Sequence, residues 1–425
     1  MQRFQGLIGI ALILGLAYLF SNNKKKINFR LVISGVLLQV LIGVLVFKVE
    51  FVQNFFRLLG RGMQQLEMFS RQGAAFVYGG IAVQQPNGAV SNYAVGNVLV
   101  FAFNITATIV LVCALVAIFY YLGVMQRLVA FIARIMRVVM RVSGAEALSN
   151  VASAFVGQVE AQVMIRPYLA TMTMSELLAS MSGSLACIAG GILIIYSNMG
   201  TAAGMNITPN LLTASLMAAP GALVISKIVY PETEESQTMG KVKLKVKSGY
   251  KNIIDAVTHG AGDGFKIAMN VIAMIIGFVA LIALLNYLLL KAGHIFNPHF
   301  DLTLDWIFGK IFYPFAWAMG IPQQDVGGAA TLLGQKLTIN EFIAFKNLTD
   351  KSLSSHVPIL TDKGLLIITI AICGFANFSS VGMQIGGIGE IAPERKGDLA
   401  KLGMKALFCG TLASYLSATI AGIIM

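Results

Sequence analysis

Long apolar runs recur along the whole chain and are separated by short polar stretches. Of the 425 residues, 57% are hydrophobic and only 12% are charged, whereas soluble domains carry about 25% charged residues. A run of about 20 apolar residues can span a bilayer as a helix. The pattern predicts an all-α polytopic membrane protein with about eight membrane-spanning helices. The predicted spans cover residues 7–20, 31–49, 97–125, 176–198, 211–230, 265–290, 364–383 and 402–425.

The positive charges lie mainly at the ends of these runs. The formal net charge is +12, but no stripe of basic and aromatic residues is present, so the charge indicates membrane topology and not nucleic-acid binding. Lysine and arginine gather in four segments that the positive-inside rule places in the cytoplasm, which predicts that both termini lie outside. Two segments also mix arginine with large apolar side chains and predict interfacial helices, at 53–72 and 126–141.

Two further apolar segments each contain a carboxylate, Glu160 or Glu341, where a charge is costly. A charge at the centre of a membrane helix costs roughly 2.5–3.5 kcal/mol even on mild scales, and such residues usually line a substrate or ion path. Because broken backbone is tolerated at membrane depth only inside protein or beside a water-filled cavity, we predict two re-entrant hairpins. The alternative is a structural ion pair, with Arg166 or Lys336 respectively. The two segments are 149–170 and 327–348.

Each predicted hairpin is followed by an apolar stretch that small residues interrupt, at 182–191 and 373–382. Paired broken hydrophobic segments in two halves of a chain, entering from opposite faces, are typical of an inverted repeat with a binding site near the membrane midplane. The predicted fold is therefore eight spans and two re-entrant hairpins arranged as an inverted repeat.

The polar groups of these segments suit hydrogen bonding and not covalent chemistry. No nucleophile stands beside a base, no P-loop is present and the four cysteines lack Cys-x-x-Cys spacing, so we expect neither an enzyme nor a bound cofactor. Carboxylates, amides and a hydroxyl favour a neutral polyhydroxylated solute such as a sugar or nucleoside. A channel-like pore for small polar solutes is the alternative function, and a membrane-embedded enzyme is a third class. The groups are Gln158, Glu160, Glu341, Asn377 and Ser380.

Three motifs resemble the concentrative nucleoside transporters, and the similarity extends over essentially the whole chain. They are Gly-Gln-Val-Glu at 157–160, Asn-Glu-Phe at 340–342 and Cys-Gly-Phe-Ala-Asn-Phe-Ser-Ser at 373–380. The resemblance implies a homotrimer in the bacterial cytoplasmic (inner) membrane that imports nucleosides by an elevator-type motion coupled to Na⁺ or H⁺. It also implies a mobile transport domain and a scaffold domain. We assign 144–200 and 321–390 to the transport domain, and 1–143, 201–320 and 391–425 mainly to the scaffold, with a cytoplasmic linker at 231–263.

The resemblance further implies roles within the site. The nucleobase would meet Gln158 and Glu160 with Val159 beside it, the ribose would meet Glu341, Asn377 and Ser380, and Phe375 would line the pocket. A Na⁺ ion would bind, largely through backbone carbonyls, at Ser153, Val156, Cys187 and Ile188. Nucleosides and membrane lipid are thus the expected partners, and nucleic-acid polymers are not.

Four positions depart from the family pattern. Val159 replaces a threonine and Gln162 a proline, which leaves the base preference open. Ser153 replaces an asparagine and Cys187 a serine. Because Na⁺ is a hard cation that prefers oxygen to sulfur, these changes weaken the predicted sodium site and make proton coupling a rival. A carboxylate buried away from water could carry the proton, and Glu341 is the candidate.

Overall fold

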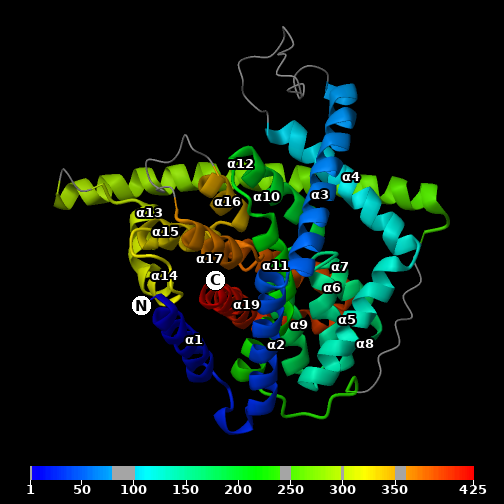
Figure 1. Cartoon of the computed structure of the whole chain (residues 1–425). Helices are drawn as coiled ribbons and strands as arrows, with labels where there is room; N and C mark the ends of the chain where they lie inside the picture. Colours follow the sequence, from blue (N-terminus) through cyan, green and yellow to red (C-terminus); the bar gives the residue numbers. More distant parts are fainter. Residues whose placement is uncertain (1, 79–100, 240–249, 298–300, 350–359) are drawn as a thin grey trace.

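The structure, a computed structural model, describes residues 2–78, 101–239, 250–297, 301–349 and 360–425 (Figure 1). Every regular element in these ranges is a helix, which confirms the predicted all-α fold. The first elements are α1 Gln2–Leu19, η1 Lys24–Lys26, α2 Phe29–Lys48, α3 Glu50–Tyr78, α4 Phe101–Tyr121, α5 Val124–Met140, α6 Gly144–Ser153, α7 Glu160–Met164, α8 Arg166–Leu169, α9 Met174–Ala186 and α10 Gly190–Ala202. They are followed by α11 Thr208–Val229, α12 Ile253–Phe296, α13 Leu304–Ile311, α14 Tyr313–Ala318, α15 Val326–Thr338, α16 Glu341–Thr349, α17 Asp362–Ile372, α18 Phe378–Ile391, η4 Pro393–Arg395 and α19 Lys396–Ile424.

Several of these helices are long and apolar enough to cross a membrane. Within the described ranges there are four such stretches, namely α2, Met174–Thr201, α11 and Pro393–Ile424. A fifth results if α4 and α5, which meet at a bend of 76°, form one broken span. The apolar part of α1 and the end of α12 are shorter. The chain is a membrane protein, and the count of eight spans stays a prediction.

Part of the predicted linker is helical in the structure. The sequence predicts a cytoplasmic linker over 231–263, and α12 begins within that range at Ile253 and continues unbroken for 44 residues. The Asn252 side chain accepts a 2.8 Å hydrogen bond from the Asp255 N–H and so caps the helix, and His259 lies 3.4 Å from the Asp255 carboxylate at i,i+4 spacing. These polar residues therefore start a helix. Residues 240–249 of the expected linker lie outside the described residues.

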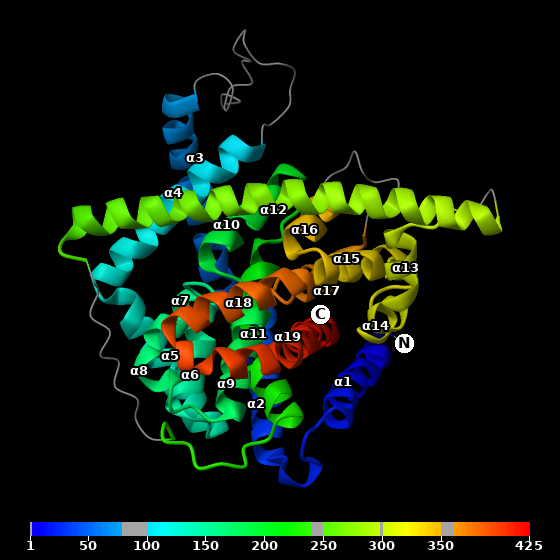
Figure 2. The ribbon, with the colours of Figure 1, turned by 180° about the vertical axis from the view of Figure 1, so that it is seen from behind.

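α12 runs along one side of the molecule, and α4 packs across it (Figures 1 and 2). The close approach depends on Gly260 and Gly264, because a Cβ at either position would collide with α4 around Cys113. The interior of the molecule is formed by α9, α11 and α19, whose residues are mostly buried and which pack against one another. The site is built around this buried centre.

Both carboxylate-bearing segments fold as helices joined by a turn. In the first, α6 leads through residues 154–159 into α7, and in the second, α15 leads through residues 339–340 into α16. Glu160 and Glu341 are the first residues of α7 and α16. In the first turn Gly157 has a φ of +125°, and a side chain there would collide with the Glu160 carboxylate. The two predicted hairpin segments thus each carry their carboxylate at a turn.

The two interrupted helices break beside each other. The chain leaves helical conformation between α9 and α10 and again between α17 and α18. The N–H of Phe375 in the second break donates a 3.3 Å hydrogen bond to the carbonyl of Cys187 in the first. Gly374 lies so close to the Ala186 carbonyl that a Cβ would collide with it. Small residues at the breaks therefore allow backbone from the two halves of the chain to meet.

Candidate functional site

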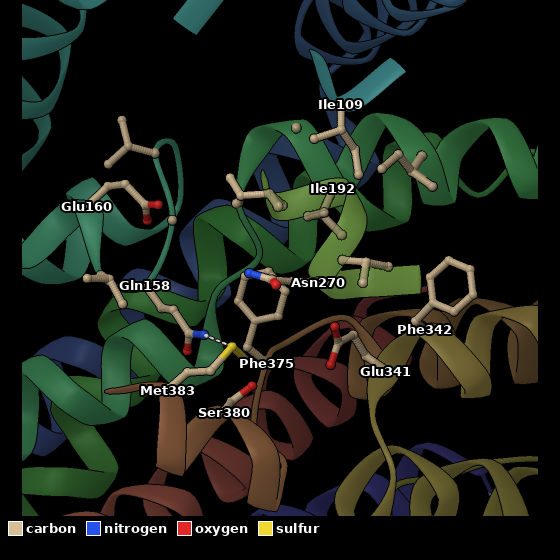
Figure 3. Close-up of a pocket in the computed structure, with 18 of the residues that line it drawn as sticks. Ile109, Gln158, Glu160, Ile192, Asn270, Glu341, Phe342, Phe375, Ser380 and Met383 are labelled. Carbon is tan, nitrogen blue, oxygen red and sulfur yellow. Dashed lines mark hydrogen bonds between the residues drawn. The ribbon is translucent and has the colours of Figure 1, made fainter. Parts of the chain in front are cut away.

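A cavity of about 260 Å³ lies where the hairpin turns and helix breaks come together (Figure 3). Glu160 and Glu341 point into it from opposite sides. Residues of α4 and α12, among them Ile109 and Asn270, close another side. All seven residues predicted to bind substrate line this cavity, namely Gln158, Val159, Glu160, Glu341, Phe375, Asn377 and Ser380. Their individual roles stay predictions.

The Glu341 carboxylate is held by two donors from distant parts of the chain. Its Oε1 accepts a hydrogen bond from the Tyr196 hydroxyl (3.1 Å), and its Oε2 accepts one from the Asn377 amide (2.7 Å). Glu341 is only 7% exposed, and Tyr196 is fully buried with its ring stacked on Phe345 at 4.3 Å between centroids. Each carboxylate oxygen has room for a second donor, so the group can accept from substrate hydroxyls without losing its protein partners.

Asn377 is fixed by its place at the start of α18. Its side-chain oxygen accepts from the Ser380 N–H (2.8 Å) and the Ser379 hydroxyl (2.7 Å), which makes it the N-cap of the helix. The amide nitrogen is then turned toward Glu341. One residue therefore ends the helix break and orients the carboxylate, and the same turn places Ser380 at the cavity wall.

The opposite wall is formed by the first hairpin turn. The Gln158 amide nitrogen lies 3.9 Å from the Met383 sulfur, and its buried amide oxygen accepts no hydrogen bond from the described residues. Leaving such an acceptor unpaired costs about 1–3 kcal/mol, so a donor on a bound solute would be favoured here. Glu160 is exposed beside it. The Gln162 amide, in contrast, is already paired within the protein. Its nitrogen donates to the Ser184 hydroxyl (2.9 Å), and its oxygen accepts from the Ser180 hydroxyl (2.7 Å).

The structural ion pairs considered as alternatives are not formed. Among the described residues, neither Glu160 with Arg166 nor Glu341 with Lys336 makes a salt bridge. Arg166 is exposed, whereas Lys336 is completely buried. The two carboxylates are therefore not held in the cavity by direct contact with these basic residues.

The residues predicted to bind Na⁺ come together where α6 ends and α9 breaks. The Ser153 hydroxyl lies 2.8 Å from the Ser184 hydroxyl and donates to the Ser149 carbonyl (2.8 Å). The Cys187 thiol points instead at the Asn150 carbonyl, 3.8 Å away. The carbonyls of Val156 and Ile188 lie outside the helices and accept no hydrogen bond from the described part of the chain. Free carbonyl oxygens suit a hard cation, but the sulfur of Cys187 does not.

Two polar residues from the apolar helices that line the cavity, Asn270 and Tyr196, were not predicted from the sequence. Asn270 is a lone amide within a predicted span, and that polarity was a usable signal. Tyr196 offers no such signal, because a tyrosine in an apolar helix usually serves packing. Only the fold shows that its hydroxyl reaches Glu341, 145 positions away in the sequence.

Comparisons with family models cover most of the chain. Residues 210–422 match a model described as Na⁺ dependent nucleoside transporter C-terminus, and residues 8–81 match the corresponding N-terminus model. Residues 102–203 match a third model, described as nucleoside recognition. The matched regions include both hairpins and both helix breaks.

Relatives and solved structures agree with these matches. The chain is 38% identical to the uncharacterized transporter YutK of Bacillus subtilis over 99% of both chains, and 36% identical to the nucleoside permease NupC of Helicobacter pylori over 98% of this chain and 96% of that one. It is 35% identical to the rat sodium/nucleoside cotransporter 2, covering 100% of this chain and 63% of that protein.

A structure of CNTnw in an inward-facing substrate-bound state superposes with a TM-score of 0.89 at 38% identity, covering 100% of this chain and 98% of that one. An intermediate state of CNTnw gives a TM-score of 0.91. The resemblance inferred from the three motifs is confirmed, and the related proteins are transporters and not enzymes. The chain belongs to the Na⁺-dependent nucleoside transporter family.

Proposed function

We propose that this protein is a cation-coupled symporter that imports nucleosides across the cytoplasmic membrane. The observation that carries the proposal is the paired hydrogen bonding of Glu341 by Tyr196 and Asn377 at the cavity wall. This arrangement holds a carboxylate as an acceptor for vicinal hydroxyls, which a ribose supplies.

The opposite wall suits a nucleobase. The unpaired oxygen of Gln158 can accept from a base N–H, and Glu160 beside it can accept directly or through water. Phe375 lines the cavity between the two walls and offers an apolar surface to the ring. A solute with a sugar at one end and a base at the other therefore matches the polar groups at both walls.

Na⁺ is the coupling ion that we favour, with H⁺ as the rival. The Ser153 hydroxyl and the carbonyls of Val156 and Ile188, which accept no hydrogen bond from the described residues, would supply oxygen ligands. Their place at a helix break supports the assignment, because unwound carbonyls commonly coordinate coupling cations in transporters. The relatives described as sodium/nucleoside cotransporters support the same ion.

For the transport step, we propose an elevator-type motion of a unit that contains both hairpins and both broken helices, residues 144–200 and 321–390. The sequence placed α11 and α19 mainly in the scaffold. We place them with the moving unit because they are buried against α9 and α17, and their contacts with α1 and α2 would then form part of the sliding surface. α1–α4 and α12 would form the scaffold of a homotrimer surrounded by membrane lipid, with both termini outside.

The test is uptake of labelled uridine and adenosine into proteoliposomes under an imposed Na⁺ gradient and then an imposed pH gradient. Uptake should require one of the two gradients and should fall roughly 100-fold in Glu341→Gln, because hydrogen bonds to a charged acceptor are worth about 1.5–3 kcal/mol each. Glu390→Gln, which neutralises an exposed carboxylate on α18, is the matched control.

Uptake that is unchanged when both the Na⁺ gradient and the pH gradient are dissipated would reject the symporter. The facilitative pore would then be the better description. Counterflow of labelled substrate separates the two mechanisms, because a carrier shows it and an open pore does not.

A further inference from the structure

A chain of hydrogen bonds connects α7 of the first hairpin to the predicted cation site. The Ser180 hydroxyl donates to the Gln162 amide oxygen (2.7 Å), and the Gln162 amide nitrogen donates to the Ser184 hydroxyl (2.9 Å). The Ser184 hydroxyl lies 2.8 Å from the Ser153 hydroxyl, which itself donates to the Ser149 carbonyl (2.8 Å). All five residues are almost completely buried, so these bonds decide how each side chain is oriented.

The donor in each of these bonds follows from the next bond along the chain, because a hydroxyl carries only one hydrogen. The Ser153 hydrogen is used on the Ser149 carbonyl, and Ser153 therefore accepts from Ser184. Ser184 has then used its own hydrogen and must accept from the Gln162 amide nitrogen. The Ser180 hydroxyl holds the amide oxygen of Gln162 on the other side. The orientation of the Gln162 amide thus sets the direction of the bonds that follow.

This direction leaves the Ser153 oxygen available as a ligand. It accepts one hydrogen bond, donates its hydrogen to the helix backbone and keeps one lone pair for which the described residues provide no donor. A hydroxyl oxygen binds a hard cation through such a lone pair. Without the donor from Gln162, the Ser184 hydroxyl can turn away, and the orientation of Ser153 is no longer fixed.

We propose that Gln162 is a positioning residue for the coupling cation, which orients the Ser153 oxygen through Ser184 and binds neither the ion nor the nucleoside itself. Hydrogen-bond partners of the groups that hold an ion commonly orient those groups, and their loss weakens ion binding without removing a ligand. The inference rests on the proposed function, and in particular on sodium coupling. Gln162 lies two residues after Glu160, so α7 carries both the base-facing carboxylate and the residue that orders the cation site.

The experiment measures the Tm of the purified full-length protein as a function of Na⁺ concentration, with choline replacing Na⁺ at constant ionic strength. Because an ion that binds the folded protein raises its Tm by mass action, this dependence gives the Na⁺ dissociation constant without any transport measurement. Gln162→Leu should increase that constant about three- to tenfold, since one orienting hydrogen bond is lost. Uridine binding at saturating Na⁺ should change by less than about twofold, because the Gln162 side chain does not line the cavity.

Gln384→Leu is the matched control. Gln384 is as completely buried as Gln162, and its amide nitrogen also bonds α9, donating to the Met181 carbonyl (3.2 Å). It has no part in the chain that reaches Ser153. This variant should therefore leave the Na⁺ dissociation constant unchanged, even if its Tm is lower at every Na⁺ concentration.

A double variant tests whether Gln162 acts through Ser153. Ser153→Ala should itself weaken Na⁺ binding about tenfold, and adding Gln162→Leu should weaken it no further, because the oxygen to be oriented is gone. Ser180→Ala is a milder variant that removes only the bond holding the Gln162 amide oxygen. It should increase the Na⁺ dissociation constant about two- to threefold, and it replaces Gln162→Leu in the test if that variant does not fold.

A purely structural network gives a different result. Gln162→Leu would then lower the Tm by the same amount at every Na⁺ concentration, and an unchanged Na⁺ dissociation constant would overturn the positioning role. Losses of Na⁺ affinity that multiply in the double variant would overturn it as well. If the wild-type Tm does not respond to Na⁺ at all, sodium coupling is rejected and the positioning role with it, an outcome that is distinct because the wild type itself then fails to respond.

Discussion

The hydroxyl of Tyr196 on α10 donates a 3.1 Å hydrogen bond to Oε1 of Glu341 at the start of α16. The tyrosine ring is held in place by stacking on Phe345, four residues after the carboxylate. The helix that follows the first break therefore fixes the carboxylate of the second hairpin. A substitution at Tyr196 should therefore alter nucleoside binding through Glu341 at the proposed ribose subsite.

Tyr196→Phe should weaken nucleoside binding about tenfold, because the Glu341 carboxylate loses one of the two donors that fix its orientation toward the substrate. The apolar ring remains, so the fold should be unaffected. Isothermal titration with uridine and adenosine would measure the loss. Tyr415→Phe is the control, since the Tyr415 hydroxyl is buried without a hydrogen-bond partner in the described structure. Equal affinities for both variants would contradict the assigned role of Tyr196.

Cys187→Ser should raise the apparent Na⁺ affinity of uptake by about three- to tenfold, because a hydroxyl oxygen replaces a soft sulfur beside the proposed cation site. The measurement is the Na⁺ concentration that gives half-maximal uptake. Cys409→Ser changes a buried cysteine on α19 and should leave that concentration unchanged. If the Cys187 variant shows the same Na⁺ dependence as wild type, the cation site lies elsewhere or H⁺ drives the cycle.

Glu160→Gln should alter the preference among nucleobases and have less effect on overall uptake than Glu341→Gln. Glu160 is exposed at the base-facing wall, so water can replace part of its interaction, whereas Glu341 is buried. Competition of the natural nucleosides for labelled uridine uptake would report the preference. A loss that is equal for every nucleoside would assign Glu160 to a shared feature of the substrates, such as the sugar.

Lys227→Met should destabilise the protein by about 3–5 kcal/mol, because it leaves a buried carboxylate unpaired. The Lys227 ammonium lies 2.8 Å from Glu146, and their side chains are only 7% and 2% exposed. Thermal unfolding in detergent would measure the effect. Lys266→Met breaks an exposed pair with Asp263 at 3.8 Å and should change stability by less than about 1 kcal/mol. Similar Tm values for the two variants would show that the buried pair is not stabilising.

The carboxylates and the helix breaks were predictable because each violates a local rule for membrane segments. Glu160 and Glu341 are charges in apolar runs, and Asn377 is a helix-capping residue where a helix should continue. These residues also carry the motifs that indicated the family. Such residues can be recognised from the local sequence alone, without knowing which residues they contact in the fold.

Other features depend on contacts that local sequence does not encode. The hydroxyl of Tyr196 finds its acceptor only through tertiary packing. Lys336 suggested a salt bridge because it is five positions from Glu341, but the two residues lie in different helices, α15 and α16, and form no salt bridge in the described chain. The helical start of α12 within the predicted linker depends on the Asn252 cap and on the Asp255–His259 contact, which only the folded chain shows.

The hydrogen bond from Phe375 to the Cys187 carbonyl joins the floor of the proposed nucleoside pocket to the backbone that would coordinate the cation. An occupant that orders one of these unwound segments should therefore restrict the other, because this hydrogen bond and the close approach of Gly374 to the Ala186 carbonyl join them. Such linkage is reciprocal, so if the ion tightens nucleoside binding by some factor, the nucleoside must tighten ion binding by the same factor. The contact between the Phe375 N–H and the Cys187 carbonyl is therefore the place where coupling between ion binding and nucleoside binding should be sought first.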